Sequence, residues 1–405
     1  MLQQKKSLLL ILFLGASILF LARCLNHADA APDPRGKAYA GAITCRQCHQ
    51  AIYDSFLNTA HFKASALALP KNIQGNFLPG KNSFAYNDSQ RIDMLKRGDS
   101  YQQVFFIKGR EQDAYKLDMV FGTRHAQTYL YLDNGQPYEL PLSHYNAVNA
   151  WGTSPGFSAS SPNFKRFIGA ECFECHSSSL ESKLNSTPAG VTQVIEKETL
   201  IYGIDCERCH GPASQHVAFH EANPDQKMAA FMVKNSTLGH QQKLDACAVC
   251  HSGNDQLKID SRFRFKMGDD LGNFFMPQLI GGRSKEADVH GNQYMLMASS
   301  KCFIKSPEMT CGSCHSSHES ATGNLKMYSQ KCMSCHQPEA NNFCPKYPEL
   351  GEAIKQNCID CHMPQQPSSA IGFQLAGTDT KSSYLLRTHK IAVYRDSLQT
   401  VHHKK

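Results

Sequence analysis

The chain has 405 residues, a hydrophobic fraction of 41% and a single tryptophan, so its protein core is modest for a length that suits two or three domains. Lys and Arg outnumber Asp and Glu by 42 to 35, giving a formal net charge of +7. This charge is spread out, with no basic run and no recognition motif, which argues against nucleic acid as a partner.

The first thirty residues have the pattern of an export signal. A basic flank at Lys5 and Lys6 precedes an apolar segment, residues 7–22, and an A-x-A-like cleavage site at residues 28–30. Two alternatives stay open: a lipoprotein modified at Cys24, and an uncleaved anchor, because the apolar segment is near the short limit for a membrane span. We therefore expect residues 1–30 to be a signal peptide or N-terminal anchor, and the protein to be periplasmic or otherwise extracytoplasmic.

Seven pentads of the form Cys-x-x-Cys-His organise the rest of the chain, and we number them motifs 1 to 7. Two thiols one helical turn apart can add to the two vinyl groups of a porphyrin, and the next residue then faces the iron. Zinc also uses Cys-x-x-Cys pairs but does not require a histidine after each. We expect seven covalently bound haems c. The motifs are Cys45/Cys48/His49, Cys172/Cys175/His176, Cys206/Cys209/His210, Cys247/Cys250/His251, Cys311/Cys314/His315, Cys332/Cys335/His336 and Cys358/Cys361/His362.

Taken in order, the chain divides into three parts after residue 30. Residues 31–69 form a first haem segment, with a helix expected after motif 1. Residues 70–165 lack cysteine and alternate between apolar and polar residues, which predicts a β-rich haem-free insert with a hairpin at Asp133-Asn134-Gly135. Residues 166–405 carry six irregularly spaced motifs, which favours a six-haem cytochrome domain over a solenoid. The expected fold is mainly α and loop, a multihaem cytochrome core with little regular sheet, plus the β-rich insert.

Each haem iron needs a second axial ligand. His216 and His318 follow the histidines of motifs 3 and 5 too closely to reach the opposite face of the same haem, so we expect each to bind a neighbouring haem. Methionine is an alternative ligand, with Met94, Met119 and Met276 as candidates. The weaker histidine candidates are His125, His144, His220 and His240. The distal ligands that we expect are His61, His216, His290, His318 and His389.

Several stretches resemble the multihaem cytochromes of the cytochrome c-554 type, which are related to hydroxylamine oxidoreductase and the multihaem nitrite reductases. Motif 1 with Tyr53, Ser55 and His61 resembles their first haem segment. The stretch Cys206-Glu-Arg-Cys-His-Gly-Pro with His216 is the most distinctive, and motif 7 followed by Met363, Pro364 and His389 resembles the last haem. The insert resembles a seven-haem branch of secreted bacterial proteins. The sequence lacks the Cys-x-x-Cys-Lys haem motif that marks one class of nitrite reductase. It also has no clear equivalent of the crosslinking tyrosine of the hydroxylamine oxidoreductases.

The resemblance implies periplasmic electron transfer along seven haems, between a membrane quinol-linked donor and a terminal acceptor or partner enzyme. The alternative is a reductase of a small nitrogen or sulfur oxyanion at one open haem, so catalysis stays undecided. Five distal histidines serve seven irons, and the haem of His176 is our candidate for the open one, with Arg124 and Arg166 to steer an anion. Cys302 and Cys344 are the two spare cysteines outside the N-terminal region, and we expect them to form a disulfide.

Overall fold

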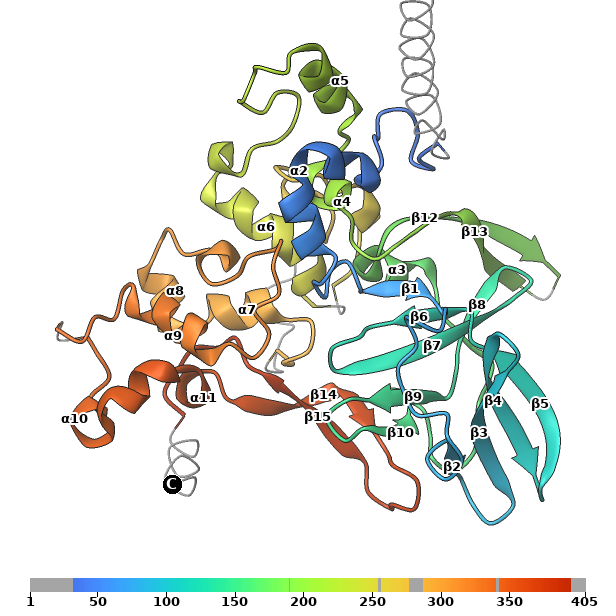
Figure 1. Cartoon of the computed structure of the whole chain (residues 1–405). Coiled ribbons are helices and arrows are strands. Elements are labelled where there is room, and N and C mark those ends of the chain that lie inside the picture. The colour runs from blue at the N-terminus through green and yellow to red at the C-terminus, as the bar shows by residue number, and fades with distance from the viewer. Residues whose placement is uncertain (1–31, 189, 254–255, 277–286, 340–341, 395–405) are drawn as a thin grey trace, which may run out of the picture.

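The computed structural model describes residues 32–188, 190–253, 256–276, 287–339 and 342–394. Antiparallel sheets occupy one side of the molecule, and short helices joined by loops occupy the other (Figure 1). The strands are β1 Ser65–Leu67, β2 Ser83–Ala85, β3 Gln90–Arg97, β4 Ser100–Ile107, β5 Arg110–Lys116, β6 Met119–Phe121, β7 Ala126–Asp133, β8 Gln136–Glu139, β9 Leu142–Tyr145, β10 Ala150–Thr153, β11 Arg166–Phe167, β12 Ser177–Thr187, β13 Gly190–Tyr202, β14 Gln365–Phe373 and β15 Ser382–Arg387.

Most helices are short, as expected for a chain that turns tightly between motifs. The α-helices are α2 Ala42–Phe56, α3 Ala170–His176, α4 Cys206–His210, α5 Ser214–Ala222, α6 His240–His251, α7 Gln293–Ala298, α8 Lys301–Lys305, α9 Leu325–Met333, α10 Tyr347–Leu350 and α11 Ile359–His362. The 3-10 helices are η1 Asn235–Thr237, η2 Arg262–Arg264, η3 Leu271–Asn273, η4 Cys311–Ser313 and η5 Gly351–Gln356. None of these described helices is long and apolar enough to cross a membrane.

Two antiparallel sheets form the larger β region. One has seven strands, in the order β1-β6-β7-β8-β11, with β9 paired to β7 and β10 paired to β9; the other has the order β2-β3-β4-β5. The hairpin that the sequence predicts joins β7 to β8, with Asp133 paired to Gln136. Asn134 and Gly135 both have positive φ, 49° and 77°, which a two-residue hairpin turn of this kind requires.

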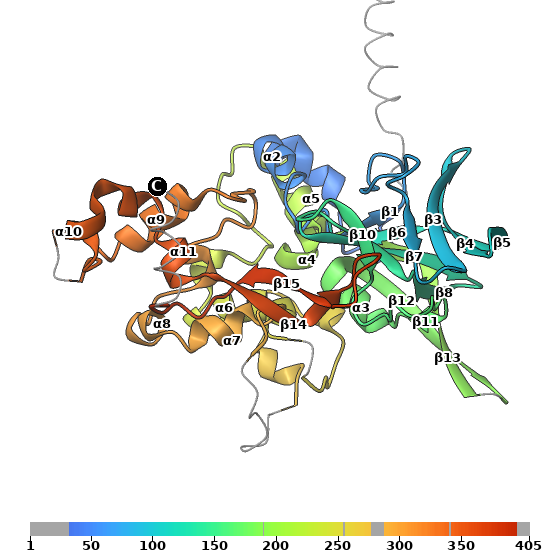
Figure 2. The same ribbon diagram turned by 90° about the horizontal axis from the view of Figure 1, so that it is seen from below.

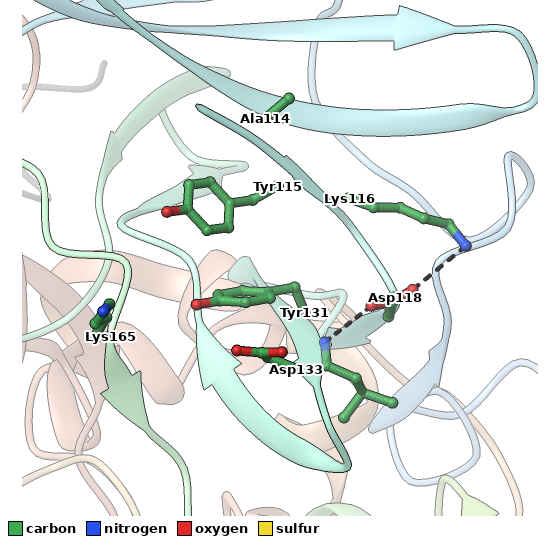
Figure 3. Close-up of a pocket in the computed structure, with 8 residues that line it drawn as sticks. Ala114, Tyr115, Lys116, Asp118, Tyr131, Asp133 and Lys165 are labelled. Atoms are coloured by element: carbon green, nitrogen blue, oxygen red, sulfur yellow. Dashed lines mark hydrogen bonds and ion pairs between the residues drawn. The ribbon is translucent and has the colours of Figure 1, made fainter. Parts of the chain in front are cut away.

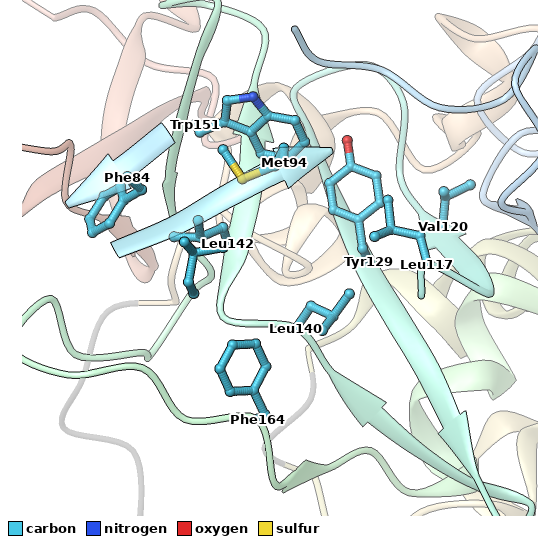
Figure 4. Close-up of a cluster of buried hydrophobic side chains, with 10 residues drawn as sticks. Phe84, Met94, Leu117, Val120, Tyr129, Leu140, Leu142, Trp151 and Phe164 are labelled. Atoms are coloured by element: carbon cyan, nitrogen blue, oxygen red, sulfur yellow. The ribbon is translucent and has the colours of Figure 1, made fainter. Parts of the chain in front are cut away.

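A hydrophobic cluster lies where these two sheets pack together (Figure 4). Ile92 and Met94 of β3 face inward at alternate positions and are fully buried, as the two-residue period of a strand requires. Trp151 closes the cluster and donates its indole N–H to the Asn76 carbonyl at 2.9 Å. The cluster holds this region together without a cofactor. Its buried members are Phe84, Ile92, Met94, Leu117, Val120, Tyr129, Leu140, Leu142, Trp151 and Phe164.

The expectation of a mainly α fold with little regular sheet is wrong. The described structure is 27% helical and 28% strand, with several antiparallel sheets and only small helices. Part of the difference is two hairpins in the region expected to be helix and loop, β12–β13 and β14–β15. The first projects from the sheet side (Figures 1 and 2) and packs its apolar face on Phe173 of α3. The second reaches back to β9, where Phe373 stacks on Tyr145.

Candidate haem-binding site

Each Cys-x-x-Cys-His motif lies on or beside a short helix, which holds its two thiols about one turn apart. Motifs 1 to 4 lie on α2, α3, α4 and α6, and motifs 5 to 7 lie at η4, α9 and α11. In α2 the helical geometry is interrupted at His49, where φ is −115° and ψ is 38°. Helix α4 is capped at its start by Asp205, which accepts the Arg208 N–H at 2.7 Å, and at its end by Gly211, where φ is 77°. The histidines of motifs 1 and 3 therefore lie at, or directly before, a break in the helical geometry.

The two thiols of motif 1 differ in their surroundings, although the sequence assigns both to one haem. Cys45 is partly buried and contacts Cys206 of motif 3. Cys48 is exposed, as are Cys209 and Cys335, whereas the other eleven motif thiols are partly buried. The reason is its place on α2, where the neighbouring residues 46–50 are exposed as well. A porphyrin can reach a thiol on such a face, so attachment of a haem through Cys48 stays a prediction.

Four motif histidines face a second histidine from another part of the chain. Four of the five expected distal ligands take part: His61, His216, His318 and His389. His216 faces motif 1 and His318 faces motif 3, so neither faces the motif that it follows in sequence. The ring-centroid distances are 6.4 Å for His49–His216, 5.9 Å for His210–His318, 6.2 Å for His251–His61 and 6.2 Å for His315–His389.

This spacing suits an iron between the rings. Imidazole nitrogens about 2 Å from an iron on both faces place the ring centroids roughly 6 Å apart. The surroundings also suit a porphyrin, because Ile43 and Ile52 of α2 are 54% and 49% exposed beside motif 1 and offer apolar surface that a macrocycle can cover. The residues present therefore fit haem at these four pairs.

Backbone carbonyls fix the tautomer of several of these histidines. A carbonyl can only accept, so the ring nitrogen in contact with it must carry the hydrogen. Where that nitrogen is Nδ1, Nε2 is free to bind a metal. Nδ1 of His216 donates to the Ala230 carbonyl at 2.8 Å. His336 donates to Asn342 at 2.7 Å, and His362 donates to Ala392 at 2.9 Å. These three imidazoles are held in the form that haem iron requires.

Burial favours the neutral, metal-binding form of two distal candidates. It lowers the pKa of His61 to about 4, with smaller contributions from His251 and His315. It likewise lowers the pKa of His389 to about 4, again with His315 and His251 contributing. His61 is positioned by a close backbone contact: its carbonyl accepts the Ile204 N–H at 2.9 Å, while Gly203, with φ 65°, lies against the Phe62 carbonyl, where a Cβ would collide.

His290, the fifth expected distal ligand, does not face a motif histidine at the same spacing among the described residues. Burial lowers its pKa, and its positive form would be repelled by the nearby His251. The closest ring contact of motif 2 is instead Phe121, which stacks on His176 at 5.0 Å and 10°. His176 is partly buried, and its Nδ1 lies 3.4 Å from the Ala64 carbonyl. Sequence reasoning missed Phe121, which no motif marks.

The other candidate ligands are less favourably placed. His240 uses Nε2 to donate to the Met309 carbonyl at 2.8 Å, and His125 contacts the Tyr384 hydroxyl at 3.3 Å. Met94 and Met119 are fully buried in apolar clusters, whereas Met276 is 52% exposed. His144 and His220 each have a buried Nε2 without a partner among the described residues. His27, His402 and His403 lie outside the described residues.

The two arginines suggested for anion steering lie beside different motifs. Arg166 bonds the Glu139 carboxylate at 3.3 Å and the Pro155 carbonyl at 2.5 Å. Burial raises the pKa of Cys172 of motif 2, and Arg166 is close enough to oppose that rise. Arg124 lowers the pKa of His315, after burial and His251, so it lies on the motif 5 side. Steering of an anion by either arginine stays a prediction.

Thiols from different motifs contact one another, which brings neighbouring motifs together in space. Four contacts join cysteines of different motifs, and four further pairs lie within electrostatic range. The contacts are Cys45–Cys206, Cys175–Cys250, Cys247–Cys311 and Cys332–Cys358. The nearby pairs are Cys209–Cys247, Cys209–Cys250, Cys314–Cys332 and Cys314–Cys335. Together they connect motifs 1, 3, 4, 5, 6 and 7 in a row, with motif 2 beside motif 4.

The expected disulfide between Cys302 and Cys344 is not present, because both are free thiols. Cys302 lies near Cys314 and Cys335, whereas Cys344 lies near Cys361. The two spare cysteines thus accompany different motifs.

Three motifs carry an acidic residue between their cysteines, and each acid binds a cation from elsewhere in the chain. Glu174 bonds Lys258 at 2.7 Å, Glu207 bonds Arg35 at 3.3 Å, and Asp360 bonds Arg387 at 2.6 Å. These acids were not predicted to be functional residues, although their position between the two cysteines of a motif is visible in the sequence.

A pocket of about 340 Å³ lies in the sheet region, away from the motifs (Figure 3). Tyr115 and Tyr131 form its aromatic wall, with ring centroids 4.9 Å apart. Lys116 and Asp118 pair at 3.4 Å on its rim. No Cys-x-x-Cys-His residue lines it, so it is not part of the haem-binding site.

Comparisons with known proteins agree with this geometry. The family model "Cytochrome c554 and c-prime" matches residues 44–79 and 142–211, which include motifs 1 to 3. The multiheme cytochrome MtrA of Shewanella baltica (strain OS185) is 26% identical over 178 residues, covering 41% of this chain and 51% of that protein. The chain thus spans about half the length of this curated relative.

Among solved structures, the crystal structure of the Outer Cell Wall Cytochrome OcwA is similar in fold. Its TM-score is 0.55 at 16% sequence identity, over 90% of this chain and 82% of that one. With the seven motifs, these findings support a multihaem c-type cytochrome with covalently bound haem c.

Proposed function

We propose that this chain is an exported seven-haem electron carrier that passes electrons along a row of haems c. All seven motifs are intact in the sequence. The observation that carries the proposal is the set of four histidine pairs with ring centroids 5.9 to 6.4 Å apart. Iron held by two imidazoles has no position left for a substrate, which suits electron transfer rather than catalysis.

The proposed route follows the thiol contacts between motifs. Electrons move between motifs 1 and 3, then through motifs 4, 5, 6 and 7, with the haem of motif 2 as a branch at motif 4. Cys45–Cys206 supports the first step, Cys247–Cys311 supports the step from motif 4 to motif 5, and Cys332–Cys358 supports the last. His61, His216, His318 and His389 are the proposed distal ligands, whereas His290 stays a proposal for motif 2.

The partners are proposed to be redox proteins outside the cytoplasm: a donor linked to membrane quinol and a terminal acceptor. The proposed location follows from covalent haem attachment and the export pattern of residues 1–30, and attachment to a membrane through these residues belongs to the proposal. The relative OcwA, named an outer cell wall cytochrome, is consistent with it. The haem-free sheet region, residues 70–165, is proposed to cover haem faces.

Intact mass after acid–acetone extraction tests the haem content. The purified chain should retain seven haems, and dithionite-reduced protein should be reoxidised by an external one-electron acceptor such as ferricyanide. Fewer than six retained haems, or haems that are reduced but not reoxidised, would contradict the proposal.

A second function, reduction of a small nitrogen or sulfur oxyanion, is favoured by one observation at motif 2. His176 has a ring contact with Phe121 and none with a second imidazole among the described residues, although His290 lies close enough to lower its pKa, after burial. If that iron is five-coordinate, reduced protein binds carbon monoxide or nitrite at one haem per chain. His176→Met should then abolish this binding and leave the other six haems unchanged. A reduced protein with only six-coordinate low-spin haem would exclude this second function.

A further inference from the structure

A buried acidic cluster lies at the junction of α2 and α4. Arg35 bonds Asp33 at 2.8 Å, Asp205 at 2.7 Å and Glu207 at 3.3 Å. All four side chains are at most 8% exposed. Three carboxylates face one guanidinium, so the cluster has a net charge of −2.

The acidic cluster is built into motifs 1 and 3. Glu207 lies within motif 3 and accepts the backbone N–H groups of Ala40, Gly41 and Ala213 at 2.8 to 2.9 Å. Gly41 caps the start of α2, which carries motif 1. Asp205 caps α4, which carries motif 3. The negative charge is therefore fixed beside the first haem-attachment helix and the start of the third.

A second cluster of opposite sign lies between motifs 2 and 4. Glu174 of motif 2 bonds Lys258 at 2.7 Å and Arg262 at 3.5 Å. Arg208 donates to the Arg262 carbonyl at 2.7 Å and the Glu174 carbonyl at 3.4 Å. Arg208, which lies within motif 3, completes this cluster, so three cations and one carboxylate give it a net charge of +2. Cys250 of motif 4 lies 4.0 Å from the Glu174 carbonyl.

The basic cluster contains guanidinium N–H donors that no acceptor among the described residues binds. Nε of Arg208 and Nε of Arg262 are both buried and have no acceptor among the described residues. Lys258 is 29% exposed, whereas Arg262 is only 6% exposed. Water screens such buried charges weakly, so their field acts on neighbouring groups at longer range than that of a surface pair.

Ferric haem carries one more positive charge than ferrous haem. A nearby carboxylate stabilises the ferric form and lowers the reduction potential, whereas a nearby cation does the reverse. We propose that these two clusters set a potential gradient across the haems of motifs 1 to 4, the first part of the route, lowest at the haem of motif 1 and highest at the haems of motifs 2 and 4. The gradient directs electrons from motif 1 through motif 3 to motifs 4 and 2. This inference rests on the proposed function of the chain as an electron carrier along a row of haems c.

Neutral variants of each cluster test the gradient in the holoprotein. Glu207→Gln should raise the lowest reduction potential, and Lys258→Gln should lower the highest. Each change should alter the reduction equilibrium of the nearest haem by about threefold to tenfold, tenfold being 59 mV for one electron. Potentiometric titration followed by absorbance and electron paramagnetic resonance measures these shifts. Asp33→Asn, whose side chain bonds only Arg35 among the described residues, is the second variant if Glu207→Gln does not fold.

Two exposed ion pairs far from the motifs provide matched controls. Glu111→Gln removes one negative charge from its pair with Arg97, in which both side chains are 41% exposed. Lys183→Gln removes one positive charge from a lysine that is 76% exposed. Neither control should move the ends of the titration curve.

The gradient is overturned if Glu207→Gln and Asp33→Asn leave the lowest potential unchanged, or if they shift it no more than Glu111→Gln does. It is also overturned if Lys258→Gln leaves the highest potential where it was. Haem content and reoxidation of the unmodified protein test the proposed function separately. The potential gradient can therefore be refuted while the proposed electron-transfer function is retained.

Discussion

Replacing His318 by alanine should open the haem of motif 3, although His318 follows motif 5 in the sequence. Its ring lies 5.9 Å from His210 and 8° from parallel, and it contacts Phe56 edge-on at 6.3 Å. Since one imidazole serves one iron, one haem per chain should change from six- to five-coordinate. Reduced His318→Ala protein should bind one carbon monoxide per chain beyond the unmodified level, and free imidazole should restore the low-spin spectrum.

A double variant separates the two assignments of His318. His389 lies 6.2 Å from His315 and is the proposed distal ligand of motif 5. If His318 serves motif 3, then His318→Ala combined with His389→Ala opens two different haems and adds two carbon monoxide molecules per chain. If both histidines served motif 5, the double variant would add only one. His240→Ala is the matched control, because its Nε2 bonds the Met309 carbonyl and should serve no iron.

Three further predictions concern stability and thiols. Burial raises the pKa of Glu139 to about 7 against the attraction of Arg166, so the folded protein loses stability as pH rises from 4.5 to 7. Glu139→Gln should therefore raise the free energy of unfolding in guanidinium by about 2 to 3 kcal/mol at pH 8 and by little at pH 4.5; an equal gain at both would refute this reasoning. Arg35→Met leaves buried carboxylates unpaired and should cost about 3 to 5 kcal/mol at pH 7. Burial raises the pKa of Asp33, but hydrogen bonds from Arg35 outweigh it and hold that pKa below its usual range, so the loss should shrink as pH falls, and a constant loss would count against it. Alkylation of the denatured, unreduced chain should label Cys302 and Cys344. If neither is labelled, the result supports the disulfide that the sequence predicted.

The haem motifs and the hairpin at Asn134-Gly135 could be recognised in the sequence because each depends on residues a few positions apart. The β12–β13 hairpin could have been recognised by the same means, since Val191, Val194 and Ile195 follow a turn-like stretch. The density of haem motifs favoured a loop-and-helix interpretation of the whole second half. Local strand propensity was outweighed by this expectation, and the fold class was wrong as a result.

Partner choice among the histidines could not be predicted from the sequence. Spacing excludes His216 and His318 from the haems next to them in sequence, but it does not say which distant motif each one faces. That depends on how α2 packs on α4 and on where the loop after η4 lies, both of which involve contacts between distant residues. The two charged clusters around Glu207 and Glu174 could not be predicted from the sequence either, because Arg35 and Lys258 lie far from these acids in the chain.

The contact between Ala40 and Glu207 spans 167 residues and has a consequence for biogenesis. Helix α2 emerges early from the ribosome or translocon, but its capping carboxylate and its facing imidazole, His216, emerge only after the whole sheet region. A porphyrin that reached motif 1 before His216 had emerged would find only one histidine, His49, to bind its iron. Contacts of such long sequence separation form slowly, so the maturation machinery has time to reach these thiols before folding closes over them.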